Sequence, residues 1–321
     1  MFCSTIIPTV GRDTLARAVE SVLKQHLPGI DFELIVVNDS GAPLPPADWQ
    51  KSPRVRLLAT YRRERSVARN TGAAVANGRY LQFLDDDDWL EPDALHHLHQ
   101  LASQSDASWL YGSSQLRDRQ LQPLIQLHHR LQGNSFLPTL AGEWIPLQAS
   151  LIRADIFFAV GGFNPLLSGP EDIDLLRRVA LRQEIAGTEA IVANILFGEA
   201  GSTTDYDRHP EQSRWAREQI LDQPGVFQRM RQSTCFQTGS AAVWHGRILR
   251  VYLTSAVWNG RRRRILTAGS RLVYAAAAAF GAGPRLFAPA LWRALSRPYA
   301  SETFARGQAA ARQAESGQPA G

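Results

Sequence analysis

Four aspartates follow one another at 85–88, in the stretch FLDDDDWL, and they are the most concentrated chemical signal in the chain. Adjacent carboxylates repel, and removing them from water is costly unless a cation holds them together. We assign Asp85 and Asp87 to a divalent metal, because Mg²⁺ and Mn²⁺ prefer oxygen ligands and combine one or two carboxylates with substrate phosphates. The alternative is a solvated loop whose last acids precede a helix. An EF-hand loop does not fit, since its glycine and its later glutamate are missing.

Two further groups of acids could take part in the same chemistry. Asp39 follows an apolar run in VVNDSG and could accept hydrogen bonds from a nucleoside base or ribose, although a turn-forming aspartate is the alternative. Glu171, Asp172 and Asp174 lie together in GPEDID. Like charge would raise the pKa of one of these carboxyls toward neutrality, as a general base requires. The alternative is that the three acids only favour the positive end of a helix.

Alternating strand and helix patterns place these acids at one edge of an α/β sheet. Apolar runs predict four strands, at 4–7, 32–37, 55–58 and 80–84. Helical spacing predicts helices at 66–76 and 92–103, and a strand, a turn and a helix follow at 145–152, 161–163 and 169–181. Asp39 and the acids at 85–88 then directly follow strands, at the edge where open α/β sheets bind ligands. No strand order can be given for 109–140.

Four stretches of the sequence, in this order, resemble the family 2 glycosyltransferases, whose fold is known as GT-A. They are IIPTVGR, ELIVVNDSG, SVARNTGAAVANGRYLQFLDDDDWLEPDAL and GGFNPLLSGPEDIDLLRRVAL, and they span about residues 4–182. The resemblance implies a Rossmann-like mixed sheet flanked by helices. It also implies an inverting, hexosyltransferase-type reaction, in which a sugar passes from a nucleotide diphosphate sugar to an acceptor hydroxyl.

The resemblance implies roles for individual residues as well. Asp172 would be the general base, and Asp85 and Asp87 would form the metal-binding DxD motif for Mg²⁺ or Mn²⁺. The residues that would contact the nucleotide of the donor are Pro8, Asp39, Arg69 and Asp86. Glu171 is a further candidate, and so is His209 as an additional metal ligand, with a plain surface histidine as the alternative.

The chain departs from the family pattern in several places. Val10 and Gly11 stand where relatives often have Tyr and Asn, and Asn38 replaces the first acid of a common DD pair. The aromatic motif of processive polysaccharide synthases is missing after RRVAL, which argues against chain polymerisation. The resemblance favours cell-envelope polysaccharide or glycolipid synthesis, with the donor sugar and the acceptor, a glycan or a lipid-linked hydroxyl, left open.

The C-terminal part of the chain is strongly basic. The formal net charge is +5, yet the residues from 240 onward carry twelve arginines against two glutamates. The stretch 247–258 places apolar residues on one side of a helix with Arg247 and Arg250 opposite, and four arginines follow at 261–264. We expect a GT-A domain over 1–204, a basic helical extension over 205–300 that binds an anionic membrane surface, and a disordered tail over 301–321. An ordinary packed helical subdomain is the alternative for the extension.

Several features of the sequence bear on where in the cell the protein is located. Cys3 and Cys235 offer neither a metal spacing nor a disulfide framework, and two buried thiols fit a reducing compartment. The start of the chain lacks the pattern of a secretion signal, and the apolar stretch 272–284 is short for a membrane span. We therefore expect a cytoplasmic protein that contacts the inner face of the membrane.

Two rival functions stay open. A nucleotidyltransferase also combines an α/β sheet, acids and a divalent ion, but it should carry a glycine-rich phosphate loop, of which PTVGRD is only a faint version. A catalytically idle nucleotide- or nucleic-acid-binding scaffold could use the arginines at 261–264. Nucleic acid is the less favoured partner, because acids are present at all three candidate sites.

Overall fold

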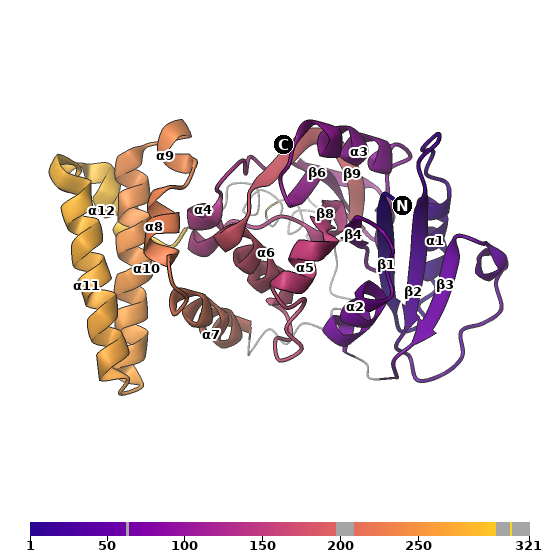
Figure 1. Ribbon diagram of the computed structural model, residues 1–321, viewed down its shortest axis with the longest axis horizontal. Coiled ribbons are helices and arrows are strands. Elements are labelled where there is room, and N and C mark those ends of the chain that lie inside the picture. The colour runs from indigo at the N-terminus through magenta and orange to yellow at the C-terminus, as the bar shows by residue number, and fades with distance from the viewer. Residues whose placement is uncertain (62–63, 197–208, 300–308, 310–321) are drawn as a thin grey trace.

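A mixed nine-stranded sheet forms the centre of the protein, with helices on both of its faces (Figure 1). The structure is a computed structural model that describes residues 1–61, 64–196, 209–299 and 309. The strands run in the order β3-β2-β1-β4-β8-β6-β9-β5, and β7 pairs with β6 outside this path. Their bounds are β1 Cys3–Thr9, β2 Phe32–Asn38, β3 Val55–Ala59, β4 Tyr80–Phe83, β5 Trp89–Leu90, β6 Trp109–Arg117, β7 Pro123–Leu127, β8 Ser150–Arg153 and β9 Ile185–Leu196.

Twelve α-helices and three 3₁₀ turns lie in the described residues. The helices are α1 Leu15–Leu23, α2 Arg65–Ala74, α3 Ala94–Gln104, α4 Phe136–Ala141, α5 Ala154–Ala159, α6 Glu171–Arg182, α7 His209–Leu221, α8 Val226–Arg231, α9 Cys235–Thr238, α10 Ala241–Arg261, α11 Ile265–Ala282 and α12 Pro289–Ser296. The 3₁₀ turns are η1 Asp48–Lys51, η2 Leu147–Ala149 and η3 Gly283–Phe287.

The four strands and the two helices expected from the sequence, at 66–76 and 92–103, are confirmed as β1 to β4, α2 and α3. The first half of the sheet is parallel. β3, β2, β1 and β4 pair in parallel, so their carboxyl ends meet at one edge. Beyond β4 the pairing becomes mixed, because β8 is antiparallel to both β4 and β6 while β9 is parallel to β6. The strand predicted over 145–152 is wrong for most of its length, since η2 occupies its middle and β8 begins only at Ser150.

Alternate residues of the parallel strands supply two separate hydrophobic cores. Ile7 and Val36 belong to the core covered by α1 and α3, whereas Ile6 and Ile35 belong to the core that contains residues of α2, α4 and α6. A strand buried on both faces must be apolar at successive positions, which explains the run FELIVV. The second core continues without interruption into α10 and α11.

Helix α2 is held close to the sheet and to the GGF turn. A Cβ at Gly72 would lie 2.5 Å from Ile6 Cγ2, so only glycine allows this approach of α2 to β1. Asn70 Nδ2 donates to Phe163 O at 2.8 Å, and Phe163 N donates to Asn70 Oδ1 at 2.9 Å. The turn itself places Gly162 at a φ of 63°. Two separate motifs of the sequence, ARN and GGF, therefore form one structural unit.

The C-terminal helices pack at the end of the molecule farthest from β3 (Figure 1). α10 lies between α11 and α12, and the apolar face predicted over 247–258 is mostly buried against them and the core. Val257 is the exception, with 55% of its surface exposed. Arg247 and Arg250 donate to Ala294 O and Leu295 O, at the C-terminus of α12, where the helix dipole favours cations. The apolar face over 247–258 is thus an internal packing surface, as the alternative of a packed helical subdomain predicts.

One segment, Ile265–Phe287, is long and apolar enough to cross a membrane by length and composition, which corrects the shorter stretch expected at 272–284. It comprises α11 and η3, and only 22% of its apolar window is buried. Both cysteines are buried free thiols, as predicted. The expected boundary at 204 and the tail over 301–321, apart from residue 309, lie outside the described residues.

Candidate active site

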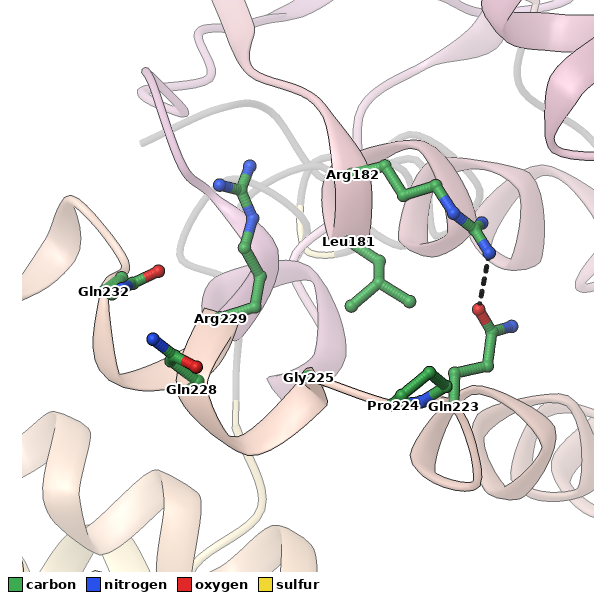
Figure 2. A pocket seen from close by; sticks show the side chains of 8 residues that line it. All are labelled: Leu181, Arg182, Gln223, Pro224, Gly225, Gln228, Arg229 and Gln232. Atoms are coloured by element: carbon green, nitrogen blue, oxygen red, sulfur yellow. Dashed lines mark hydrogen bonds between the residues drawn. The ribbon is translucent and has the colours of Figure 1, made fainter.

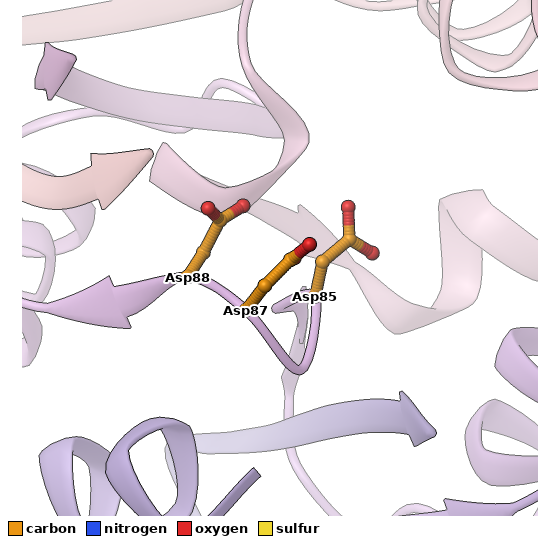
Figure 3. Close-up of side chains that lie close together, drawn as sticks. All are labelled: Asp85, Asp87 and Asp88. Carbon is orange, nitrogen blue, oxygen red and sulfur yellow. The ribbon is translucent and has the colours of Figure 1, made fainter. Parts of the chain in front are cut away.

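Three carboxylates meet in the loop that follows β4. Asp85, Asp87 and Asp88 each offer an oxygen, and these oxygens lie within 4.8 Å of one another. Figure 3 shows the three side chains projecting to the same side of the loop. Such a set of oxygen donors fits Mg²⁺ or Mn²⁺. Burial, and next the negative charge of Asp85, raise the pKa of Asp87 to about 6. A bound cation would relieve the repulsion between these two carboxylates.

Asp88 is the member of this cluster that sequence reasoning missed. The alternation of Asp85 and Asp87 suggested a pair, but the backbone turns here, and Asp88 N donates to Asp85 O at 3.1 Å. This turn brings the fourth acid beside the first. Asp88 is buried, and its Oδ1 accepts from Leu196 N at 2.8 Å, so the end of β9 holds it in place.

Asp86 points away from the other three acids and toward the end of β1. Its Oδ2 accepts from Thr9 Oγ1 at 2.6 Å and its Oδ1 from Arg12 Nη1 at 2.7 Å. Arg12 also donates to Asp87 Oδ2 at 3.0 Å. Pro8 lies within β1, next to Thr9, the last residue of that strand. Thr9 and Arg12, the latter in the loop after β1, thus join the end of β1 to the acid loop at 85–88. Both belong to the IIPTVGR stretch, but nothing in their spacing indicated this contact.

Asp39 follows β2 at the same edge of the sheet and is buried. Its Oδ1 accepts from Thr60 Oγ1 at 2.6 Å and its Oδ2 from Glu64 N at 2.6 Å. These bonds fix the connection between β3 and α2.

A chain of buried ion pairs connects the acid loop to the start of α6. Arg69 donates from Nη2 to Asp85 Oδ1 at 2.5 Å and from Nη1 to Glu171 Oε1 at 3.0 Å. Arg65 Nε lies 2.6 Å from the same Glu171 oxygen, and Gln148 Nε2 donates to Asp85 Oδ2 at 3.0 Å. Burial would raise the pKa of Asp85, but Arg69 and Arg65 together outweigh it and lower that pKa. Glu171, held by two arginines, positions Arg69 and is not a free base.

Asp172 is the carboxylate on α6 suited to proton abstraction. It is half-buried, and its Oδ2 accepts from Trp144 Nε1 at 2.9 Å. Burial, and next the charge of Glu171, raise its pKa to about 6. Asp174 does not contribute, because Arg178 Nη2 pairs with it at 2.7 Å. Trp144 lies far upstream in the sequence, and no local pattern could have linked it to Asp172.

His209, the candidate further metal ligand, is the first residue of α7, but its side chain lies outside the described part of the chain. Arg62 and Arg63, in the basic stretch YRRER at 61–65, also lie outside the described residues.

A separate pocket lies at the far end of α6 (Figure 2). Its volume is about 320 Å³, and its lining includes Arg182, Gln223 and Arg229. Arg182 Nη2 donates to Gln223 Oε1 at 2.9 Å, while Arg229 donates to the carbonyls of Ala180 and Gln183. Its lining has no carboxylate, and about ten residues of helix, roughly 15 Å, separate it from Asp172. The pocket therefore has no part in the acid site.

A family model and several curated relatives each match part of this chain. The family model described as "Glycosyl transferase family 2" matches residues 4–164. "Succinoglycan biosynthesis protein ExoO" of Rhizobium meliloti (strain 1021) is 41% identical over 98 residues, which cover 30% of this chain and 28% of that protein. "Poly(ribitol-phosphate) beta-N-acetylglucosaminyltransferase TarP" of Staphylococcus aureus (strain N315) is 33% identical over 115 residues, covering 34% of this chain and 35% of that protein. The chain thus spans about a third of the length of the curated relatives it matches.

The fold has solved counterparts. The structure of S. aureus TarS 1–349 in complex with UDP-GlcNAc superposes with a TM-score of 0.60 at 15% identity, covering 84% of this chain and 90% of that chain. This likeness establishes a GT-A-like fold, with a mixed sheet flanked by helices and further C-terminal helices.

Proposed function

This chain belongs to glycosyl transferase family 2, and on that premise we propose that it transfers a sugar from a nucleotide diphosphate sugar to an acceptor hydroxyl, with inversion at the sugar carbon. The observation that carries the proposal is the bridge made by Arg69, which binds Asp85 at 2.5 Å and Glu171 at 3.0 Å. The bridge links the acid cluster, which would hold a metal, to Glu171, the residue beside the raised-pKa carboxyl of Asp172.

The acid loop serves the leaving group. Breaking the bond between the sugar and the diphosphate leaves concentrated negative charge, which a divalent cation held by Asp85, Asp87 and Asp88 would stabilise as it develops. Arg12 and Arg69 hold these carboxylates in place, so that little reorganisation is needed during the reaction. Mg²⁺ and Mn²⁺ both suit the ligand set.

Asp172 acts on the acceptor. In an inverting transfer, a base must take the proton of the attacking hydroxyl on the face of the sugar opposite the leaving group. A carboxyl with a pKa of about 6 is mostly ionised at neutral pH and remains basic enough for this role. The N–H of Trp144 orients the carboxylate by donating to one of its oxygens.

The donor nucleotide would lie along the carboxyl ends of β1, β2 and β4. We assign Asp39 to the base, Asp86 to the ribose, and Pro8 and Arg69 to the surrounding contacts, all at this edge. Uridine is the first nucleoside to test, because the related fold of TarS has been determined with UDP-GlcNAc. The acceptor is a hydroxyl of a glycan or of a lipid-linked sugar.

The relatives suggest the biological setting. ExoO is named for succinoglycan biosynthesis, and TarP is named as a poly(ribitol-phosphate) beta-N-acetylglucosaminyltransferase. We assign this chain to cell-envelope polysaccharide or glycolipid synthesis, in the cytoplasm and at the inner face of the membrane.

Thermal stabilisation by UDP, GDP and dTDP, each with and without Mn²⁺, tests the donor site. A ligand that binds only the folded state raises the unfolding midpoint. We expect one nucleotide to raise it in the presence of Mn²⁺, and the Asp87→Asn variant to lose that effect. Stabilisation by none of the three, or by all of them regardless of Mn²⁺, would contradict the assignment.

Product analysis separates this proposal from nucleotidyl transfer. Sugar transfer releases a nucleoside diphosphate, whereas a nucleotidyltransferase releases pyrophosphate. A mobility-shift assay with RNA at increasing salt covers the remaining alternative, a nucleic-acid-binding scaffold.

A further inference from the structure

The outer face of α11 carries a continuous apolar stripe. Leu266, Val273 and Phe280 follow at intervals of seven residues, which is nearly two full turns, so they lie on one side of the helix. Their exposed fractions are 92%, 68% and 89%. Phe287 lies in η3, after α11 has ended at Ala282, and is 89% exposed. Between Arg264 and Arg285 this exposed face has no charged residue, because Arg271 is buried. Monomeric soluble proteins seldom expose so large an apolar surface without a partner.

The inner face of α11 is fixed to the rest of the protein. Arg271 donates to Leu221 O at 3.1 Å, to Ser255 Oγ at 3.1 Å and to Asp222. Glu218, also buried, accepts from Ser255 and Asn259 and lies 3.8 Å from Arg271. This polar network joins α7, α10 and α11, so the helix cannot leave the fold to cross a bilayer without exposing a buried charge to lipid. Any partner that covers the stripe must therefore bind while α11 stays packed in the fold.

Positive charge lies at both ends of the stripe. Arg261, Arg263 and Arg264 are exposed at its start, and Arg285 and Arg293 are exposed beyond Ala282. No Asp or Glu occurs anywhere from 223 to 301. Two copies that packed their stripes together would bring arginines near arginines, and Glu211, the acid beside the run at 261–264, already pairs with Arg262. An anionic lipid surface, in contrast, complements both the apolar stripe and the arginines at its ends.

We propose that the outer face of α11 and η3 is a membrane-docking surface that lies in the interface of an anionic bilayer, with Leu266, Val273, Phe280 and Phe287 inserted between the lipids. Trp292, 55% exposed on α12, adds an aromatic side chain of the kind that prefers this interface. The proposal rests on the membrane association proposed above and not on sugar transfer. It gives the enzyme direct access to lipid-linked acceptors.

Flotation with lipid vesicles tests the docking surface. The full chain, without donor or metal, is mixed with vesicles of phosphatidylglycerol and phosphatidylcholine in equal parts, or of phosphatidylcholine alone. We expect flotation mainly with the anionic vesicles. The double variant Phe280→Ser, Phe287→Ser should weaken binding by roughly tenfold or more, since two large apolar side chains are lost. The Arg261→Gln, Arg263→Gln variant should weaken it by about tenfold at low salt and little at high salt.

A matched control uses exposed apolar residues outside α11. Phe158 and Leu166 are 51% and 75% exposed, and Phe158→Ser, Leu166→Ser should leave flotation unchanged. Equal flotation of wild type and of the Phe280→Ser, Phe287→Ser variant, or no flotation of either, overturns the proposal. It is also overturned if sedimentation without lipid shows a wild-type dimer that this variant loses, because the stripe would then bind a second copy. Since no donor is present, these results are independent of the sugar-transfer assay.

Discussion

The catalytic part of the sheet and the C-terminal helices both use arginine heavily, but in opposite ways. At the active site Arg12, Arg65 and Arg69 meet carboxylates, and Arg69, which is buried, pairs with both Asp85 and Glu171. In α10 the arginines meet backbone carbonyls at the end of α12, and after α10 they face solvent. Arg262 and Arg271 are the exceptions: Arg262 pairs with Glu211 of α7, and the carboxylate partners of Arg271 come from the end of α7.

This difference separates two physical uses of one side chain. A buried guanidinium must be paired, and the pairs at the active site also fix the geometry of the acids that do the chemistry. Unpaired arginines around an apolar face instead give long-range attraction to anions, which salt weakens. Changes in the first region should therefore alter turnover and stability, and changes in the second should alter partner binding.

The largest expected effect is the loss of the general base. Asp172→Asn should lower kcat by roughly 10²- to 10⁴-fold while nucleotide binding persists, because a group needed only for proton transfer is removed. Release of nucleoside diphosphate measures the rate, and thermal stabilisation by nucleotide measures binding. Asp174→Asn, two residues further along α6, is the control and should leave kcat within about tenfold. Equal losses in both variants would contradict the role of Asp172.

The second-largest effect is expected on the free energy of unfolding, from the loss of a buried ion pair. Arg69→Met should lower the free energy of unfolding by about 3 to 5 kcal/mol, because Glu171, also buried, loses a partner. Arg263→Met, at an exposed arginine, should change it by less than about 0.5 kcal/mol. Urea unfolding followed by circular dichroism compares the two variants. Similar losses would show that the two regions do not use arginine differently.

The pH dependence of turnover is a smaller effect. Because only the ionised form of Asp172 is a base and its pKa is about 6, kcat/KM should rise with pH through that value. One unit below it, the rate should be about tenfold under its plateau. Trp144→Phe removes a hydrogen bond that lowers this pKa, so the acidic limb should move to higher pH. If the acidic limb of the kcat/KM profile does not move, Trp144 does not influence the group that titrates.

The smallest effect on the isolated protein is expected at the apolar stripe. Phe280→Ala should change the free energy of unfolding by no more than about 0.5 kcal/mol, because the side chain already faces solvent. Phe163→Ala, at a buried ring of the core, should cost about 3 to 5 kcal/mol. Calorimetry in the absence of lipid measures both. A large loss for Phe280→Ala would show that the stripe packs within the protein.

Local sequence patterns determined the first four strands and the placement of several candidate site residues. The apolar runs fixed β1 to β4, because a parallel strand buried on both faces must be apolar at successive positions. Asp39 and the acids after β4 followed from those strands, since parallel strands end at one edge. Asp85 and Asp87 were therefore predictable as neighbours. Burial is the main cause of the raised pKa of Asp172, and the smaller contribution of Glu171 beside it was expected from the sequence.

Only the tertiary structure decided which distant side chains complete these local groups. The turn at Asp85 adds Asp88 to the cluster, Trp144 reaches Asp172 across 28 positions, and Arg12 reaches Asp86 across 74. The same limit explains the C-terminal helices: 247–258 has the amphipathic pattern, yet its apolar face is buried, while the exposed stripe lies on α11. Periodicity shows that a helix has an apolar face, but what covers that face depends on how the helices pack.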